Sequence, residues 1–486
     1  MNTDDKKRKV RVRIAPSPSG YVHVGTARTA IFNYLFARHH GGDFLVRIEN
    51  TDETRSSQEF VDGILEAMKW LGLTWDEDII YQSDRADLYA EHAQKILESG
   101  YGYRCFCTPE QLQADRDEAK ANKSSMLYNR RCLKLSREEV DRKLADGVPH
   151  TIRIRIPDGE LEFDDLVSGH LTRSSNDVED FIIARSDGSA TYNLAVVVDD
   201  HLMDISHVIR GNDHVTNTFK QIQIYKALGW DVPQFAHVPL ILRPDKKKVS
   251  KRLGDKDVVA YREEGVLPEA MLNYLCLLGW SPKTDREIYS RDELIELFNA
   301  ENFNSSNAIF DEEKLLAFNQ EYIAHAGEHE LAVIAAPMLV DAGFTTKYWL
   351  ETRWEYLRQV IGLFKPRMKK VSDLIDQCDY FFSGDFQYDP ETVAKRFTPE
   401  AAGWLTELAD RFEKLTRFVP EELERVLDEL AEELGQKRAA LIHPTRLAVS
   451  GRPHGPGLFE MLTVLSQSVV IDRMRKAADY IRHNNK

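Results

Sequence analysis

The sequence predicts an α/β protein: a doubly wound domain with a mixed α+β insertion, followed by an all-helical C-terminal region. Three observations lead to this prediction. Residues 9–49 show a strand, a loop, a helix and a second strand; strand-like apolar segments return after residue 190; and the pattern past residue 267 is almost wholly helical. Because 486 residues are too many for one core, we expect about three or more domains.

The first predicted strand leads directly into a helix. Apolar residues alternate with arginines over residues 10–14, which is typical of a short strand. Prolines and Gly20 end this strand, and apolar positions recur at helical spacing from Thr26 onward. His23 and Gly25 lie where the helix begins. Free backbone N–H groups and the positive end of the helix dipole would suit a phosphate there.

The same pattern continues to about residue 100. Residues 44–49 predict a second strand, and helices are predicted over residues 60–71 and 85–98. A strand, a helix and a strand form a βαβ unit, which is the building block of a parallel sheet.

The pattern changes between residues 101 and 192, which we interpret as an insertion. Helical residues 109–123 precede short strands, the clearest of them over residues 151–156. The α/β pattern then resumes, with a buried strand predicted over 191–200, a strand over 205–210, a helix over 216–228 and a strand over 235–242. Residues 244–254 follow as a mobile basic loop rather than a core element, since five cations fall within seven residues.

Composition excludes several classes of protein. The chain has 64 Lys and Arg against 79 Asp and Glu, a net charge of −15, which argues against non-specific polyanion binding but not against a local basic face for RNA. No apolar run approaches the ~18 residues of a membrane span. Five cysteines are few and odd in number, which argues against a disulfide framework. We therefore expect a cytoplasmic protein that does not contact a membrane.

Two segments resemble the signature motifs of a known family. Residues 13–20, RIAPSPSG, with His23-Val24-Gly25-Thr26 are similar to the first motif of the class I aminoacyl-tRNA synthetases, in the version of the bacterial glutamyl-tRNA synthetases. Lys248-Val249-Ser250-Lys251-Arg252 resembles the second motif. Residues 47–49, 191–192, 197–203 and 208–211 match the family's order between the two motifs, so the resemblance covers nearly the whole chain.

The resemblance implies an ATP-dependent ligase that activates glutamate to glutamyl-adenylate. The enzyme would then transfer glutamate to the 3′-terminal ribose of tRNA(Glu), releasing AMP and diphosphate. It also implies a Rossmann-type catalytic domain over residues 1–100 and 193–254, an inserted acceptor-stem-binding domain over 101–192, a connecting stem-contact domain over 255–325, and a helical anticodon-binding region over 326–486.

The resemblance also implies the site residues. Those that bind glutamate would be Arg13, Ala15, Ser17, Glu49, Tyr192 and Arg210. Those that bind ATP would be His23, Gly25, Asp213, Leu240, Ile241, Lys248, Val249, Ser250, Lys251 and Arg252, with His23, Lys248 and Lys251 as the catalytic residues. Arginine forks can grip carboxylates with two parallel hydrogen bonds, and Glu49 suits the ammonium group. The strand pattern alone favours another interpretation of Arg13, as a solvent-facing residue on an edge strand.

Two kinds of metal site follow from the resemblance. Mg²⁺ is expected with the phosphates of ATP, held mostly by phosphate and water oxygens. Cys105, Cys107 and Cys132 are candidate zinc ligands, because some members bind zinc there through Cys-x-Cys and Cys-x-His. Lys134 replaces that histidine, and lysine is a poor zinc ligand, so we favour three metal-free cysteines. Asn50, Asn212 and Thr26 also depart from the usual family pattern, without removing a group that we assign to catalysis.

In the helical region, Arg367 and Arg446 resemble arginines that contact anticodon bases. Bidentate readout of a splayed base by arginine is physically sensible. The alternative for each is a solvated cation at a helix end. Gly455 stands where the family has a contact residue with a side chain, which puts the stringency of anticodon reading in question.

The alternative function is a catalytically inactive tRNA-binding derivative of the same fold. A short paralogue is disfavoured because it lacks the anticodon-binding region, and the glutaminyl enzyme is disfavoured because its C-terminal half is a β-barrel. We expect a monomer. The sequence leaves open whether tRNA(Gln) is also charged with glutamate.

Overall fold

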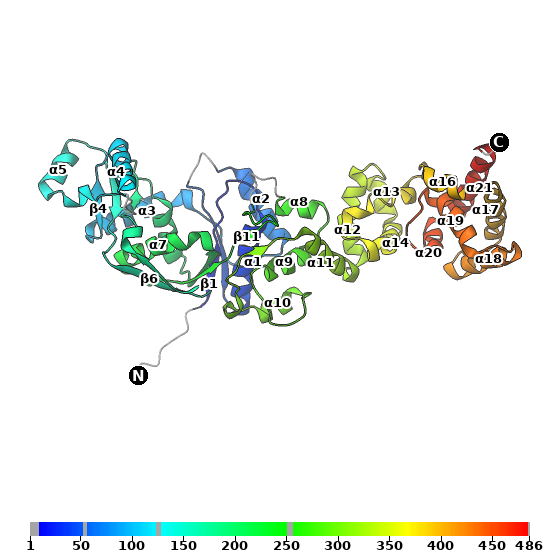
Figure 1. Cartoon of the computed structure of the whole chain (residues 1–486), viewed down its shortest axis with the longest axis horizontal. Coiled ribbons are helices and arrows are strands. Elements are labelled where there is room, and N and C mark those ends of the chain that lie inside the picture. The colour runs from blue at the N-terminus through cyan, green and yellow to red at the C-terminus, as the bar shows by residue number, and fades with distance from the viewer. Residues whose placement is uncertain (1–8, 52–55, 123–127, 250–255, 485–486) are drawn as a thin grey trace. The chain divides into compact units, whose positions relative to one another are not determined.

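The computed structural model describes residues 9–51, 56–122, 128–249 and 256–484 (Figure 1). These residues form two compact units. The first runs to Tyr261 and also contains Met271–Glu312, and the second combines Arg262–Ala270 with the residues from Glu313 onward. The finer division into five regions stays a prediction.

Two sheets with parallel strands form the centre of the first unit. One has the order β1 (Arg11–Ile14), β2 (Asp43–Ile48), β3 (Ile80–Tyr81). The other has the order β7 (Gly169–Ser174), β6 (Glu160–Asp165), β10 (Gln234–Val238), β9 (His207–Gly211), in which only the β6–β7 pair is antiparallel. The sheets meet beside β1, where the Ser206 N–H donates to the Arg11 carbonyl at 2.9 Å just before β9 begins. This arrangement confirms the predicted doubly wound domain.

Helices cover the strands and fix their ends. The helices of this part are α1 (Val24–His39), α2 (Gln58–Trp70), α3 (Ala86–Glu98), α6 (Tyr192–Leu202) and α7 (Val215–Leu228). Helix α1 is tied to β9 because the buried Asn33 amide donates to the Ile209 carbonyl at 3.0 Å. Helix α7 packs over β6 (Figure 1), with the Phe163 and Phe219 rings 4.9 Å apart. The predicted helices over 60–71, 85–98 and 216–228 are therefore present, with bounds shifted by a few residues.

Residues 191–200 were expected as a strand, and this prediction is wrong: they lie almost entirely in helix α6. The run 194–198 is apolar and rich in β-branched valine, which favours a strand. In the structure, however, residues 194–200 are all buried, so the helix has no polar face that could reveal its period. The predicted strand over 235–242 is also divided. It breaks at Pro239, which has no N–H to donate, into β10 and β11 (Ile241–Leu242).

The predicted insertion contains both helices and strands, as expected. It has an antiparallel sheet of β4 (Gly102–Cys105), β5 (Thr151–Ile154) and β8 (Ile182–Ala184), with helices α4 (Pro109–Ala121) and α5 (Arg137–Ala145). Strands β6 and β7 also come from this segment, yet β6 pairs with β10 of the central strands. The insertion thus shares a sheet with the strands that follow it.

The remainder of the described chain is mostly helical, which confirms the predicted C-terminal region. Helices α8 (Val258–Glu263), α9 (Pro268–Leu277) and α10 (Arg291–Leu297) are accompanied by the short strand β12 (Ala308–Ile309), which pairs with β11. The following helices are α11 (Glu312–His325), α12 (Glu328–Asp341), α13 (Lys347–Thr352), α14 (Trp354–Phe364), α15 (Asp379–Phe382), α16 (Pro390–Arg396), α17 (Pro399–Glu413), α18 (Pro420–Glu433), α19 (Arg438–Ser450), α20 (Leu458–Leu465) and α21 (Gln467–Asn484).

One buried core holds the second unit together. It includes Leu408 and Phe412 of α17 beside Met474 and Ala477 of α21. Across the described ranges, no helix combines the length and the apolar character needed to cross a membrane.

Helix α6 is anchored by Asp199, whose carboxylate is fully buried. It accepts hydrogen bonds from Gln82 Nε2 at 2.8 Å, Arg85 Nε at 2.7 Å and Tyr89 Oη at 2.8 Å. We expect Asp199→Ala to lower the free energy of unfolding by about 3–5 kcal/mol, because it leaves a cation and two polar groups without their shared acceptor. Urea unfolding measures this loss. The exposed Asp231→Ala is the control and should change stability by less than about 0.5 kcal/mol.

Candidate active site

A cavity of about 250 Å³ opens where the carboxyl ends of β1 and β9 lie side by side. In doubly wound sheets, ligands bind at such a point, because the chain leaves neighbouring strands in opposite directions and opens a crevice. Every predicted glutamate and ATP residue that the structure describes lines this cavity: Arg13, Ala15, Ser17, His23, Gly25, Glu49, Tyr192, Arg210, Asp213, Leu240, Ile241, Lys248 and Val249. Ser250, Lys251 and Arg252 lie outside the described residues.

On one side of the cavity, helix α1 presents its N-terminus. His23 is the N-cap residue, and its Nδ1 accepts from the backbone N–H groups of Gly25 at 3.1 Å and Thr26 at 3.4 Å. Because Nδ1 accepts, the neutral imidazole carries its proton on Nε2. A Cβ atom at position 25 would lie 3.0 Å from the His23 ring, so a larger residue would push the imidazole away from the helix start.

The opposite side is built on a buried cluster of charges. Arg13 is 3% exposed, and its Nε and Nη2 donate to the two carboxylate oxygens of Asp200 at 3.0 and 3.2 Å. The solvent-facing interpretation of Arg13 is therefore wrong: β1 is the outer strand of its own sheet, but Arg13 is buried against Asp200 of helix α6. Arg47 Nη1 also donates to Asp200, at 2.6 Å, and its Nη2 donates to Glu49 at 3.3 Å.

These ion pairs set the protonation of both acids. Burial alone would raise the pKa of Asp200, but the charges of Arg13 and Arg47 lower it to about 2. For Glu49 burial dominates, and it raises the pKa despite the nearby arginines.

Arg210 reaches the cavity from the end of β9. Its Nη2 donates to Thr218 Oγ1 at 2.6 Å and to Gln221 Oε1 at 2.7 Å, and its Nε donates to His237 Nε2 at 3.3 Å. Its Nη1 is buried and has no hydrogen-bond partner within the part of the chain that the structure describes. A buried donor without a partner is costly, so this nitrogen is suited to an incoming acceptor.

The wall nearest to the basic loop carries the predicted ATP residues. Lys248 Nζ lies 2.7 Å from Asp213 Oδ2, and both side chains are about half exposed. The backbone of Leu240 is already paired, since its N–H donates to Asn307 Oδ1 and its carbonyl accepts from Ala308. The Ile241 carbonyl accepts from the N–H of Val249, the second residue of the second motif, which closes a short hairpin.

The residues that line the cavity without having been predicted include three polar side chains, those of Arg28, Thr29 and His214. Arg28 is buried on α1, and its Nη atoms donate to the backbone carbonyls of Leu278 and Pro239. The helical period places Arg28 one turn beyond Gly25, which could have identified it. His214 Nδ1 lies 3.1 Å from Tyr192 Oη, and burial together with the charge of Arg210 lowers the pKa of His214 to about 4. This imidazole is therefore neutral near pH 7.

Comparison with known proteins identifies the family. Residues 9–317 match the class I tRNA synthetases (E and Q), catalytic domain, and residues 330–478 match an anticodon binding domain. Glutamate–tRNA ligase 1 of Syntrophomonas wolfei is 44% identical over 483 residues, which cover 97% of each chain. The chain belongs to the glutamate–tRNA ligase family of class I tRNA synthetases. It is thus a ligase whose reaction uses ATP.

Other members of the ligase family are similar to this chain over nearly its whole length. The glutamate–tRNA ligase of Moorella thermoacetica is 42% identical over 486 residues, 98% of this chain and 99% of its own. The crystal structure of a glutamate tRNA ligase from Elizabethkingia meningosepticum in complex with its amino acid has a TM-score of 0.88 and 33% identity, covering 98% of this chain and 100% of that chain. The crystal structure of the glutamate–tRNA synthetase from Elizabethkingia anophelis has a TM-score of 0.85 and 33% sequence identity. The match covers 97% of this chain and 100% of that chain.

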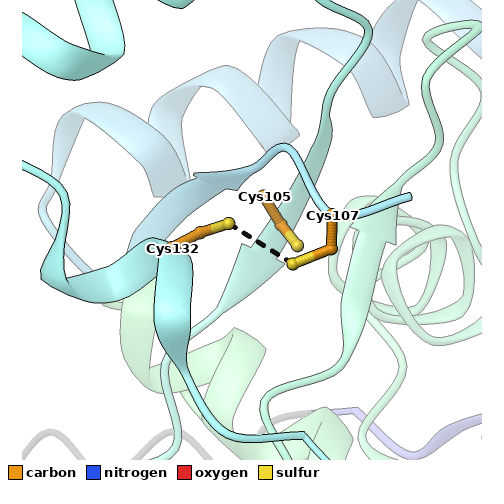
Figure 2. A group of neighbouring side chains, drawn as sticks. All are labelled: Cys105, Cys107 and Cys132. Carbon is orange, nitrogen blue, oxygen red and sulfur yellow. Dashed lines mark hydrogen bonds between the residues drawn. The ribbon is translucent and has the colours of Figure 1, made fainter. Parts of the chain in front are cut away.

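In this ligase, three cysteines from the predicted insertion point toward one another (Figure 2). The Sγ atoms of Cys105, Cys107 and Cys132 all lie within 4.8 Å of one another, and Cys107 Sγ is 3.5 Å from Cys132 Sγ. Lys134 is exposed at the end of the 3₁₀ turn that holds Cys132, and no fourth His, Cys, Asp or Glu joins the group among the described residues. These donors do not fit a closed structural zinc site, which takes four such ligands.

The two predicted anticodon arginines of the ligase lie close to one glycine. Arg367 Nη1 donates to the Gly455 carbonyl, and a Cβ atom at position 455 would lie 3.2 Å from Arg446 Nη1. This Nη1 is buried and, within the described residues, has no hydrogen-bond partner. Burial lowers the pKa of Arg446, and the charge of Arg367 lowers it further. Their roles toward the anticodon stay a prediction.

Asp200 should stabilise the ligase at neutral pH and not in strong acid. Its pKa is about 3.9 in an unfolded chain and about 2 in the folded one, so folding favours the charged form. The resulting stabilisation, about 2–3 kcal/mol, is present above pH 4 and is lost as the pH falls toward 2. In urea unfolding, the stability difference between the wild type and Asp200→Asn should therefore shrink between about pH 7 and about pH 3. A difference that stays constant would contradict this assignment.

Lys134→His should turn the cysteine cluster into a zinc site, because it supplies the missing imidazole two residues after Cys132. We expect about one zinc per chain in the variant and much less in the wild type, after both are dialysed against a chelator. Atomic emission measures the metal content. Lys143→His, on the neighbouring helix α5, is the control and should bind no additional zinc. A wild type that keeps one zinc per chain would refute the prediction.

Proposed function

We propose that the chain is a glutamate–tRNA ligase that forms glutamyl-adenylate from glutamate and ATP. It then transfers the glutamyl group to the 3′-terminal ribose of tRNA(Glu), releasing AMP and diphosphate. One observation carries this proposal: a single cavity combines two arginines and a glutamate on one side with the N-terminus of α1 on the other. The relatives named glutamate–tRNA ligase support the same substrate.

Glutamate brings two carboxylates and one ammonium group to the site. We assign the carboxylates to Arg13 and Arg210, whose guanidinium groups can donate two hydrogen bonds each, and the ammonium group to Glu49. Ala15, Ser17 and Tyr192 line the same cavity and would exclude water around the amino acid.

The phosphates of ATP belong at the start of α1. The His23 Nε2–H and the N–H groups of the first turn, two of which now donate to His23 Nδ1, are donors of the kind that phosphate oxygens need. Gly25 lets the phosphates approach closely. We assign the ribose to Asp213 and the adenine to the backbone near Leu240 and Ile241. Because the backbone of Leu240 is already paired, adenine would have to use a second lone pair or displace a hydrogen bond.

In the first step, an α-carboxylate oxygen of glutamate attacks the α-phosphorus, and the bond to the leaving diphosphate breaks. The nucleophile is already an anion, so no general base is required. Catalysis then depends on positioning and on stabilising the negative charge that builds on the phosphoryl oxygens. We assign this stabilisation to His23 and Lys248, with Lys251, Ser250 and Arg252 of the second motif. Mg²⁺ would add positive charge at the phosphates, held by phosphate and water oxygens rather than by assigned side chains.

The helical unit would bind the anticodon end of tRNA. Our candidates for reading its bases are the exposed Arg367 and Arg446, whose buried Nη1 has no partner among the described residues. We propose that the enzyme acts as a monomer in the cytoplasm, where tRNA is charged for protein synthesis.

The test is exchange of labelled diphosphate into ATP by the purified protein. We expect exchange that requires both glutamate and tRNA. Exchange that is equally fast without tRNA would contradict the family-based expectation, and no exchange under any condition would indicate an inactive tRNA-binding derivative.

Lys251→Ala should lower the activation rate by about 100-fold or more, with little change in the KM for glutamate, because its charge is needed in the transition state. Lys247→Ala, from the exposed part of the same loop, is the control and should leave the rate nearly unchanged.

A further inference from the structure

Arg210 is a buried cation, and the side chains that accept its hydrogen bonds within the described ranges are neutral. Its guanidinium contacts a hydroxyl, an amide oxygen and an imidazole nitrogen, from Thr218, Gln221 and His237. It forms no ion pair with a carboxylate of any residue in the described ranges. Arg210 is 6% exposed, so water screens its charge poorly. A buried charge with neutral partners favours an incoming ligand of opposite charge.

Arg13, which lines the same cavity, has a different kind of partner. Both oxygens of Asp200 accept from Arg13, so the protein itself already balances that charge. The two arginines are therefore not equivalent. Arg13 can orient a substrate carboxylate by hydrogen bonding. Arg210 can do the same, and a bound carboxylate would also neutralise its buried charge.

The tautomer of His237 is fixed by Asp165 at the end of β6. Asp165 Oδ2 lies 2.7 Å from His237 Nδ1, and both side chains are fully buried. A carboxylate can only accept, so Nδ1 carries the proton and Nε2 is left as an acceptor for Arg210 and Thr218. Burial, which outweighs the hydrogen bond to Asp165, and the charge of Arg210 lower the pKa of His237, which keeps the ring neutral.

Asp165 is itself held rigidly. Its Oδ1 accepts from the backbone N–H groups of Val167 at 3.0 Å and Ser168 at 2.8 Å, and its Oδ2 accepts from the His237 N–H at 3.0 Å. These hydrogen bonds hold Asp165 in place without involving Arg210. Asp165 can therefore set the tautomer of His237 without pairing directly with the arginine.

We propose that Gln221 and His237 determine the preference of this pocket for a carboxylate over a carboxamide, by holding Arg210 through neutral acceptors that leave its charge for the substrate. The inference rests on the proposed function, since it takes glutamate as the substrate. Asp165 and His237 are positioning residues: they act through Arg210 and do not touch the substrate.

The substitution Gln221→Glu tests whether the neutrality of the groups around Arg210 matters, because it adds a negative charge while the side chain keeps nearly the same shape. It places a carboxylate where an amide oxygen now lies 2.7 Å from Arg210 Nη2. We expect the KM for glutamate to rise about 10- to 100-fold, with a much smaller effect on glutamine, so that the ratio of kcat/KM for glutamate over glutamine falls at least about tenfold. The KM for ATP should stay within about twofold. Each variant is measured by diphosphate exchange in the presence of tRNA, beside its thermal melting curve.

Two matched variants separate charge from geometry. Gln221→Met removes the same hydrogen bond without adding a charge and should largely keep the glutamate preference. Gln234→Glu adds the same charge at the exposed start of β10, the strand that carries His237, and should change nothing. If Gln221→Met loses the preference as fully as Gln221→Glu, or if Gln221→Glu keeps it, the inference is wrong.

Asp165→Asn tests the role of the His237 tautomer. It is also the second test of the proposal if the Gln221→Glu variant does not fold. The amide N–H₂ would face His237 Nδ1, turn it into an acceptor and direct an Nε2–H at the Nε–H of Arg210. We expect the same fall in the glutamate preference, with the KM for ATP unchanged. Asp164→Asn is the control, because Asp164 is the neighbouring residue on β6 and also pairs with a histidine, but at the surface. If Asp165→Asn affects glutamate and ATP equally, its role is only structural. A wild type that shows no glutamate-dependent exchange would instead refute the proposed function.

Discussion

The first unit depends on one buried pairing of charges. Asp199 and Asp200, at the end of α6, hold arginines that come from β1, β2 and the segment before α3: Arg13, Arg47 and Arg85. Each group alone would be very unfavourable in the interior, and each is stable only with its partners in place. The same contacts orient Arg13 and Glu49 toward the cavity. Stability of the fold and shape of the site are thus properties of one cluster.

The elements that the sequence predicted well are those that have one clear period. The short strand over 10–14 and the helix after it alternate or repeat cleanly, and both are present. Helix α6 could not be predicted in this way because it is buried on all sides, and its valines favour a strand. The pairing of β6 with β10 was also beyond local patterns, since register between distant strands leaves no mark within either segment.

The lining of the site was predicted more fully than the support behind it. Thirteen residues inferred from motif resemblance line the cavity, because motifs record the side chains that face ligands. Asp165, Thr218, Gln221 and His237 lie behind Arg210 and belong to no quoted motif. A buried Asp–His pair formed by residues 72 positions apart can be found only once the strands are in place.

The pairing of Arg13 with Asp200 also constrains the order of folding. The two residues are 187 positions apart, and Arg47 and Asp200 are 153 apart. During synthesis, the first strand and its arginines leave the ribosome long before the acids that neutralise them. The strand cannot be buried at low cost until α6 has been made, so the N-terminal βαβ unit is unable to complete its core alone. Long-range contacts of this kind slow folding. The first unit should therefore complete its folding late, although its strand β1 is synthesised first.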